Sequence, residues 1–166
     1  MNLARITDST DKFVANRITL EEFGGGFERD GHDRVNRMSD TPVMTQNITE
    51  PAILIRISRL YRPGMSAHDL YEATRGVWVV GGRRDGATYA FAVHEGIVKE
   101  VYEIESWHPA GTTPYTSRSF TDLQREGRWE FLGRPAPDEV RGQYVGRSVA
   151  AYFERGNANP IMYVNC

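Results

Sequence analysis

Cysteine is nearly absent from this 166-residue sequence, in which Cys166 is the single residue of its type. One cysteine can form neither an intramolecular disulfide nor a cysteine-based zinc site, and this scarcity favours the reducing environment of the cytoplasm. No run of about 18 apolar residues occurs, and the first residues lack the apolar core of a secretory signal. We therefore expect a cytoplasmic protein with no membrane partner.

Lysine is also scarce, because Lys12 and Lys99 are the only two and the other basic residues are arginines. Arginine forms bidentate contacts with phosphate and with base edges better than lysine does. The same bias arises from the codon usage of a GC-rich genome, and a net charge of −2 gives no overall attraction to nucleic acid. Both interpretations of the arginines stay open at this point.

The first 48 residues differ from the rest of the chain, since they show little apolar periodicity and contain three consecutive glycines at 24–26. A segment of this kind buries too little apolar surface to offset the entropy lost on ordering. We predict that residues 1–48 are largely disordered or loosely attached, with one short helix near residues 20–23. Residues 51–166 are predicted to form one domain, which matches the length of a chain with a single core.

The domain is predicted to begin with a strand at residues 52–57, where a near-continuous apolar run indicates burial on both faces. Ser66 and Asp69 have the spacing of a helix N-cap and its partner, and Gly76 is predicted to end this helix in the left-handed conformation. The remaining predicted elements are strands at 77–80, 128–133 and 160–164 and short helices after Pro137 and Ser148.

A β-hairpin over residues 89–108 is the most strongly marked feature of the sequence. Two runs rich in Val, Ile, Phe and Tyr flank residues 94–96, which we predict to be a three-residue loop with a positive φ at Gly96. Adjacent apolar pairs in the second run predict a β-bulge near residues 99–100. A long polar connection is predicted at residues 105–128, and connections of this length are commonly functional or disordered.

The order of these elements is strand, helix, strand, hairpin, long loop, strand, short helices and strand. It predicts an α+β fold built on a small, strongly bent mixed β-barrel, because a hairpin rather than a helical crossover joins the two central strands.

With its helix at 66–75 between the first two strands and its hairpin strands at 88–93 and 97–104, the chain resembles the PUA-like superfamily. That group includes PUA, ASCH, EVE, YTH and SRA domains. The resemblance covers about residues 51–166 and identifies no single branch, since the Gly-x-Lys-x-x-Glu-x-Arg motif of ASCH domains is absent. It implies binding of DNA, RNA or a nucleotide, including a modified or flipped base held between aromatic faces.

A base-binding site of this kind needs stacking surface, hydrogen-bonding groups for the base edge and arginine for phosphate. We predict a cleft between the 66–75 helix and the long polar connection. The candidates are Trp107 as the stacking face, His108 and Ser106 as edge contacts, Arg75 and Arg118 as phosphate contacts, and Trp78, Trp129 and Asn159 as further binding residues. Each tryptophan also has the alternative role of a packing residue.

Two other function classes stay open. One is a small hydrolase or nuclease, for which Glu103, Glu105 and His108 lie close in sequence, but no nucleophile–base pair or metal-ligand set has a diagnostic spacing. We therefore predict no catalytic residue, no metal and no cofactor. The other is a protein-interaction or sensor module that binds no nucleic acid. The sequence leaves the oligomeric state open.

Overall fold

The computed structural model describes residues 45–153 and 155–166. The disorder predicted for residues 1–48 falls mostly on residues 1–44, and that part lies outside the described residues. The short helix predicted near residues 20–23 lies wholly outside them. Within the described part, Ile48 is buried in the core, so the fold includes residues before Pro51. No helix among the described residues is long and apolar enough to cross a membrane.

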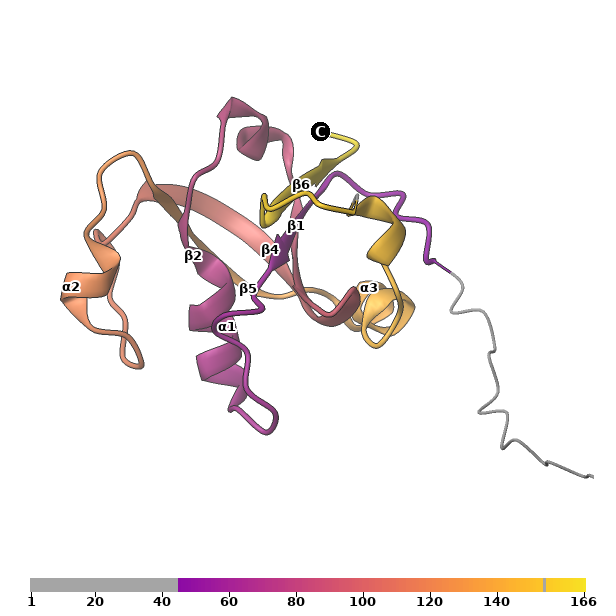
Figure 1. Ribbon diagram of the computed structural model, residues 1–166, viewed down its shortest axis with the longest axis horizontal. Helices are drawn as coiled ribbons and strands as arrows, with labels where there is room; N and C mark the ends of the chain where they lie inside the picture. The colour runs from indigo at the N-terminus through magenta and orange to yellow at the C-terminus, as the bar shows by residue number, and fades with distance from the viewer. Residues whose placement is uncertain (1–44, 154) are drawn as a thin grey trace, which may run out of the picture. The chain divides into compact units, whose positions relative to one another are not determined.

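Six strands form one mixed sheet that curls into a half-barrel, in the order β2-β5-β4-β3-β1-β6 (Figure 1). The strands are β1 (Ala52–Arg56), β2 (Gly76–Trp78), β3 (Tyr89–His94), β4 (Ile97–Pro109), β5 (Trp129–Pro135) and β6 (Ile161–Val164). The helices are α1 (Ala67–Arg75), α2 (Phe120–Leu123) and α3 (Asp138–Tyr144), with 3-10 turns at Gly82–Gly86 and Ala150–Tyr152. β1 and β3 pair in parallel, and the other neighbouring strands pair antiparallel. The predicted α+β class with a curled mixed sheet is confirmed, but the sheet is open, with β2 and β6 at its edges.

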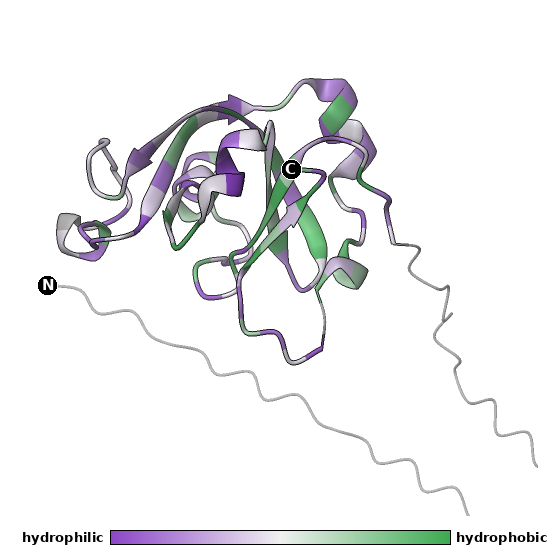
Figure 2. Ribbon diagram, turned by 90° about the horizontal axis from the view of Figure 1, so that it is seen from above, coloured by the Kyte–Doolittle hydropathy of each residue, from purple (hydrophilic) through white to green (hydrophobic). Residues whose placement is uncertain are grey.

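Apolar side chains cover both faces of the central strands, as expected for β1. Leu54 packs with Phe91 and Tyr144 in a cluster next to α3, whereas Ile53 and Ile55 belong to a second cluster on the α1 side. The inner residues of β1 have no exposed surface. Figure 2 shows the most hydrophobic stretches of ribbon along the strands that cross near the middle of the domain.

The start of α1 is as predicted, whereas its end is not. The Ser66 hydroxyl accepts a hydrogen bond of 3.0 Å from the Asp69 backbone N–H. Gly76 is extended, with φ −168°, and leads directly into β2, so the prediction of a left-handed residue was wrong. Glycine is required here for space, because an added Cβ would lie 2.8 Å from the Cβ of Glu130 and would overlap the hydroxyl of Tyr115.

The β3–β4 hairpin contains the predicted bulge but a shorter turn than predicted. Ala92 pairs with Glu100 and Val93 with Val98, which leaves Lys99 as the extra residue and confirms the bulge. The loop has two residues rather than three, because strand pairing continues to the end of β3. Both loop residues have positive φ, 52° and 75°, which is the backbone of a type I′ turn.

β4 is longer than the sequence pattern indicates, and this changes the position of two candidate residues. Pairing with β5 continues through Trp107, His108 and Pro109, so the long connection begins after residue 109 and not at residue 105. A second bulge near Glu105 lets the strand bend and stay paired. Trp107 and His108 therefore lie inside a strand, where neighbouring side chains point to opposite faces.

Candidate functional site

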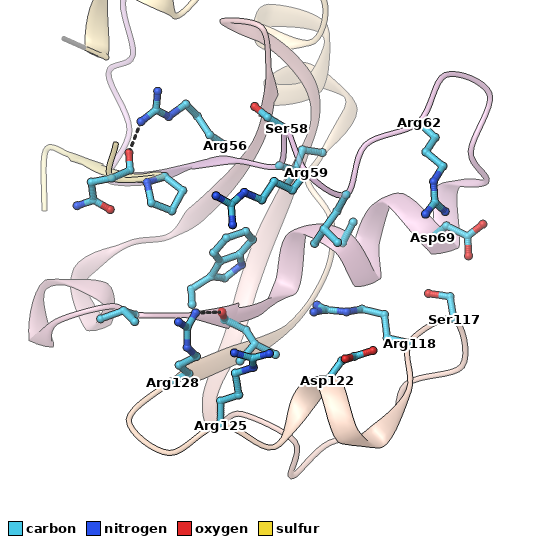
Figure 3. Close-up of a pocket in the computed structure, with 18 of the residues that line it drawn as sticks. Arg56, Ser58, Arg59, Arg62, Asp69, Ser117, Arg118, Asp122, Arg125 and Arg128 are labelled. Atoms are coloured by element: carbon cyan, nitrogen blue, oxygen red, sulfur yellow. Dashed lines mark hydrogen bonds between the residues drawn. The ribbon is translucent and has the colours of Figure 1, made fainter. Parts of the chain in front are cut away.

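A cavity of about 1050 Å³ lies beside α1, between that helix and the connection from β4 to β5. Four segments form its walls: residues 56–62 from the end of β1 onward, residues 65–79 with α1 and β2, residues 117–128 around α2, and residues 157–160 before β6. The position between α1 and the long connection is the one predicted for the cleft. Figure 3 shows that its charged side chains come from both sides of the cavity.

Six of the lining residues are arginines, namely Arg56, Arg59, Arg62, Arg118, Arg125 and Arg128. We call them the cleft arginines. None of them forms an ion pair with a carboxylate of residues 45–153 or 155–166. The acidic lining residues are Asp69 and Asp122, so six positive and two negative groups give the cavity a formal charge of +4. Such a concentration of one charge in a concave site attracts anions.

Three cleft arginines are held in place by backbone carbonyls. Arg118 donates to the Gly76 carbonyl, and Arg128 donates to the Val77 carbonyl at 3.1 Å. Arg56 donates to carbonyls of the 157–160 segment, one of them at 2.5 Å. A carbonyl orients a guanidinium without neutralising it, and a guanidinium has five N–H donors, so each of these arginines keeps its charge and further donors for a ligand.

The other three cleft arginines, Arg59, Arg62 and Arg125, are exposed. Their side chains form no hydrogen bond with any residue that the structure describes. Arg59 and Arg62 follow β1, and Arg125 follows α2 on the other side of the cavity (Figure 3). These side chains are available to bind an anion from solvent.

The cavity also has an apolar part, formed around the end of β2. Trp78 is half-buried, and its indole N–H donates to the Thr74 carbonyl at 2.7 Å, which fixes the orientation of the ring. Val79 beside it is 64% exposed, and Leu60 and Met65 are among the other apolar residues of the lining. A fixed tryptophan next to free guanidinium groups can stack a planar ring while arginines contact its phosphate.

The segment that carries Arg118 is held by Glu72, a buried carboxylate on α1. Glu72 accepts hydrogen bonds of 2.7 Å from the backbone N–H groups of Thr116 and Ser117, and the Ser117 hydroxyl donates to it as well. Burial raises the pKa of this carboxyl, but these hydrogen bonds and the nearby imidazole of His68 outweigh burial and lower the pKa to about 2. Glu72 is therefore ionised at neutral pH and fixes this part of the loop.

Glu130 on β5 holds the preceding part of the same loop. Its carboxylate accepts from the backbone N–H groups of Gly111, Thr112 and Thr113, at 2.9, 3.1 and 2.8 Å. Burial raises the pKa of Glu130, and these hydrogen bonds more than compensate, so the pKa lies below its usual value. Two buried carboxylates thus hold residues 111–117 through main-chain donors.

Arg75 completes this buried support and does not reach the cavity. Only 2% of its surface is exposed, and its guanidinium lies 3.6 Å from the ring centroid of Tyr115. It donates to the Thr113 hydroxyl at 2.7 Å and to the Pro114 carbonyl. Arg75, a candidate phosphate contact in the sequence, therefore occupies an internal position under the loop.

Of the eight candidate residues, three line the cavity: Trp78, Arg118 and Asn159. The Asn159 side-chain oxygen already accepts from the backbone N–H of Ile161 at 3.0 Å. The sequence interpretation missed five of the cleft arginines. Arg56, Arg59 and Arg62 recur every third residue, and that spacing was a signal available before the structure.

The other two candidate tryptophans are packed against neighbouring side chains away from the cavity. Trp107 lies edge-on to Phe131, with ring centroids 5.4 Å apart, and donates to the Arg84 carbonyl at 3.1 Å. The guanidinium of Arg84 covers Trp129 at 3.7 Å from the ring centroid. Neither of these tryptophans is among the described residues that line the cavity.

Ser106 and His108 lie on the face of β4 opposite to Trp107, because the three residues alternate along the strand. The Ser106 hydroxyl and His108 Nε2 are 2.8 Å apart, which is the distance of a nucleophile and its base. No hydrogen bond from a third residue to the His108 ring occurs within the described part of the chain, and the pair lies outside the cavity. The three residues predicted to form one site are therefore divided between two faces.

No group of three or more potential metal-ligating side chains comes together among residues 45–153 and 155–166. No family model matches this sequence, and comparisons with curated proteins and with solved structures find no match.

Proposed function

We propose that this domain binds nucleic acid or a nucleotide in the cavity lined by the cleft arginines. The observation that carries the proposal is six arginines without a carboxylate partner in the described structure, placed around a cavity of about 1050 Å³ next to a fixed tryptophan. Guanidinium groups bind phosphate through paired N–H donors, and an indole face stacks on any base. A nucleotide unit contains both of these chemical groups.

The proposal includes membership of the PUA-like superfamily. The curled mixed sheet and the position of α1 between β1 and β2 support this assignment. The arginines and Trp78 favour nucleic acid over a protein ligand, because the repeated phosphates of a nucleic acid pair with several guanidinium groups and its bases stack on an indole. The Ser106–His108 pair gives less support to a hydrolase, since it lies outside the cavity.

Binding of fluorescently labelled DNA and RNA, single-stranded and duplex, tests the proposal by anisotropy at about 0.1 M salt. The informative variant is Arg59→Gln/Arg62→Gln/Arg125→Gln, since these side chains are exposed and hold no other element in place. We expect it to weaken binding by about 10-fold or more, because each lost phosphate contact removes a charge-assisted hydrogen bond.

Arg147→Gln is the matched control, because Arg147 is an exposed arginine outside the cavity. It should bind as the unchanged protein does. Absence of binding to every nucleic acid would overturn the proposal. Equally tight binding of an acidic peptide, poly-glutamate, would overturn it in favour of a protein-interaction module.

A further inference from the structure

We infer that the cavity holds a single-stranded segment with several phosphates, contacted from two opposite walls, rather than one nucleotide or a duplex. This inference rests on the proposed function and specifies its ligand. It rests on where the cleft arginines originate, on the volume of the cavity that they line and on the fixed position of Trp78 in that lining.

The cleft arginines form two walls. One set consists of Arg56, the last residue of β1, and of Arg59 and Arg62, which follow it. The other set, Arg118, Arg125 and Arg128, belongs to the segment from β4 to β5. Figure 3 shows the two sets facing each other across the cavity, with Arg59 and Arg62 on one side and Arg125 and Arg128 on the other. The three guanidinium groups of each set together have more N–H donors than the few oxygens of one phosphate group can accept, so more than one phosphate is needed to pair both sets.

The volume is large enough for more than one nucleotide. Pockets for small molecules span roughly 300–1,000 Å³, so a cavity of about 1050 Å³ lies at the upper limit for one ligand of that size. A single nucleotide would leave one arginine wall facing water and unpaired. A strand of several nucleotides supplies phosphates to both walls and fills the space between them.

Trp78 distinguishes a single strand from a duplex. The indole is fixed by its hydrogen bond to Thr74 and lies at the end of β2, next to the carbonyls that bind Arg118 and Arg128. A base can stack on this ring only when it is unstacked from its neighbour, which is common in single strands and requires extra energy in a duplex. The adjacent guanidinium groups are then placed to contact the phosphates that flank the stacked base.

A length series tests this inference: thymidine monophosphate, then oligothymidylates of two, four, six and eight nucleotides, measured by competition against a labelled octamer. We expect affinity to rise by about 100-fold or more from the monomer to the tetramer or hexamer and then to level off, as both walls become occupied. For the octamer, log K should fall against log salt with a slope of about −3.5 to −4, from about 0.7 for each of five or six phosphate contacts.

The two walls are tested separately with Arg59→Gln/Arg62→Gln on one side and Arg125→Gln on the other. Both changes should weaken octamer binding and reduce the salt slope, by about 1.4 and about 0.7 respectively. With the monophosphate, only one of the two changes should weaken binding, because this ligand reaches one wall. Arg147→Gln should change none of these values.

Three results would overturn the inference and leave the proposed function intact: a monophosphate that binds about as tightly as the octamer, a duplex that binds more tightly than the strand, or octamer binding that depends on one wall only. Absence of binding to any nucleic acid would overturn both. The two failures are therefore distinguishable in one experiment.

Discussion

Acidification should destabilise this domain through Glu72, the buried carboxylate that holds residues 116–117. Only 3% of its side chain is exposed, and its pKa is lowered from 4.5 to about 2. A pKa lower in the folded than in the unfolded state means that folding favours the ionised form. Its contribution to stability is complete above about pH 4.5 and is lost as the pH falls through about 2.

The difference between the two pKa values corresponds to a contribution of about 3 kcal/mol at neutral pH. About 2 kcal/mol of it should be lost by pH 3, where the unfolded chain is largely protonated at this residue and the folded chain is not. Such a loss is a large share of the total stability of a domain, which is typically about 5–15 kcal/mol.

Urea denaturation followed by tryptophan fluorescence, at pH 7, 5, 4 and 3, measures this contribution. Glu72→Gln replaces the carboxylate by a neutral group, so its free energy of unfolding should be lower at pH 7 by about 2–3 kcal/mol and should depend less on pH. Other carboxylates titrate in both proteins, so the difference between the two profiles isolates Glu72.

Glu126→Gln is the control, because Glu126 is exposed and forms no ion pair or hydrogen bond with the residues that the structure describes. Its pH profile should match that of the unchanged protein. If Glu72→Gln retained the full pH dependence, the reasoning that assigns the low pKa to the hydrogen bonds of residues 116–117 would be refuted.

Three further outcomes are expected. Trp107→Ala should lower the free energy of unfolding, measured in urea, by about 2–4 kcal/mol, because the indole packs on Phe131. Trp107→Phe should stay folded and bind nucleic acid as the unchanged protein does. Weaker binding by a folded Trp107→Phe protein would show that Trp107 belongs to the binding site. Gly76→Ala should destabilise the domain by about 2 kcal/mol or more through overlap with Tyr115, whereas Gly142→Ala, with open space around it in α3, should stabilise by about 0.5–1 kcal/mol; equal effects at the two glycines would contradict the packing described. The melting temperature of the free protein should rise with salt concentration, since salt screens the repulsion among the cleft arginines. A melting temperature that falls with salt would contradict this repulsion.

Short-range sequence patterns predicted most strands of the sheet. They did not predict a strand end that depends on pairing with a strand distant in sequence. The bulge at Lys99 follows from adjacent apolar pairs within one strand, and the cap at Ser66 follows from a residue three positions away. The end of β4 has no local signal, because Trp107 and His108 remain in the strand through pairing with β5, more than twenty residues later. Without that partner, the polar end of β4 is indistinguishable from a loop in the sequence.

The candidate site was predicted only in part, again because some of its residues are distant in sequence. The cleft between α1 and the long connection was located correctly, but the arginines that line it come from segments that only the folded chain brings together. Arg75 was predicted to contact the ligand but is buried. An arginine at the end of an amphipathic helix is usually exposed, whereas the loop that Glu72 and Glu130 hold covers this one.

The position of β1 between β3 and β6 affects how the chain folds. The first four residues of β1 are buried and apolar, yet one of its two edges is completed by Met162 and neighbouring residues from the opposite end of the domain. Contacts between residues so far apart in sequence slow folding, since a long loop must close before they form. During synthesis β1 emerges well before β6 and has an open hydrogen-bonding edge, which is where chains associate with one another. Folding in milliseconds to seconds is therefore expected in stopped-flow fluorescence, and truncation before β6 should give aggregation rather than a smaller folded domain.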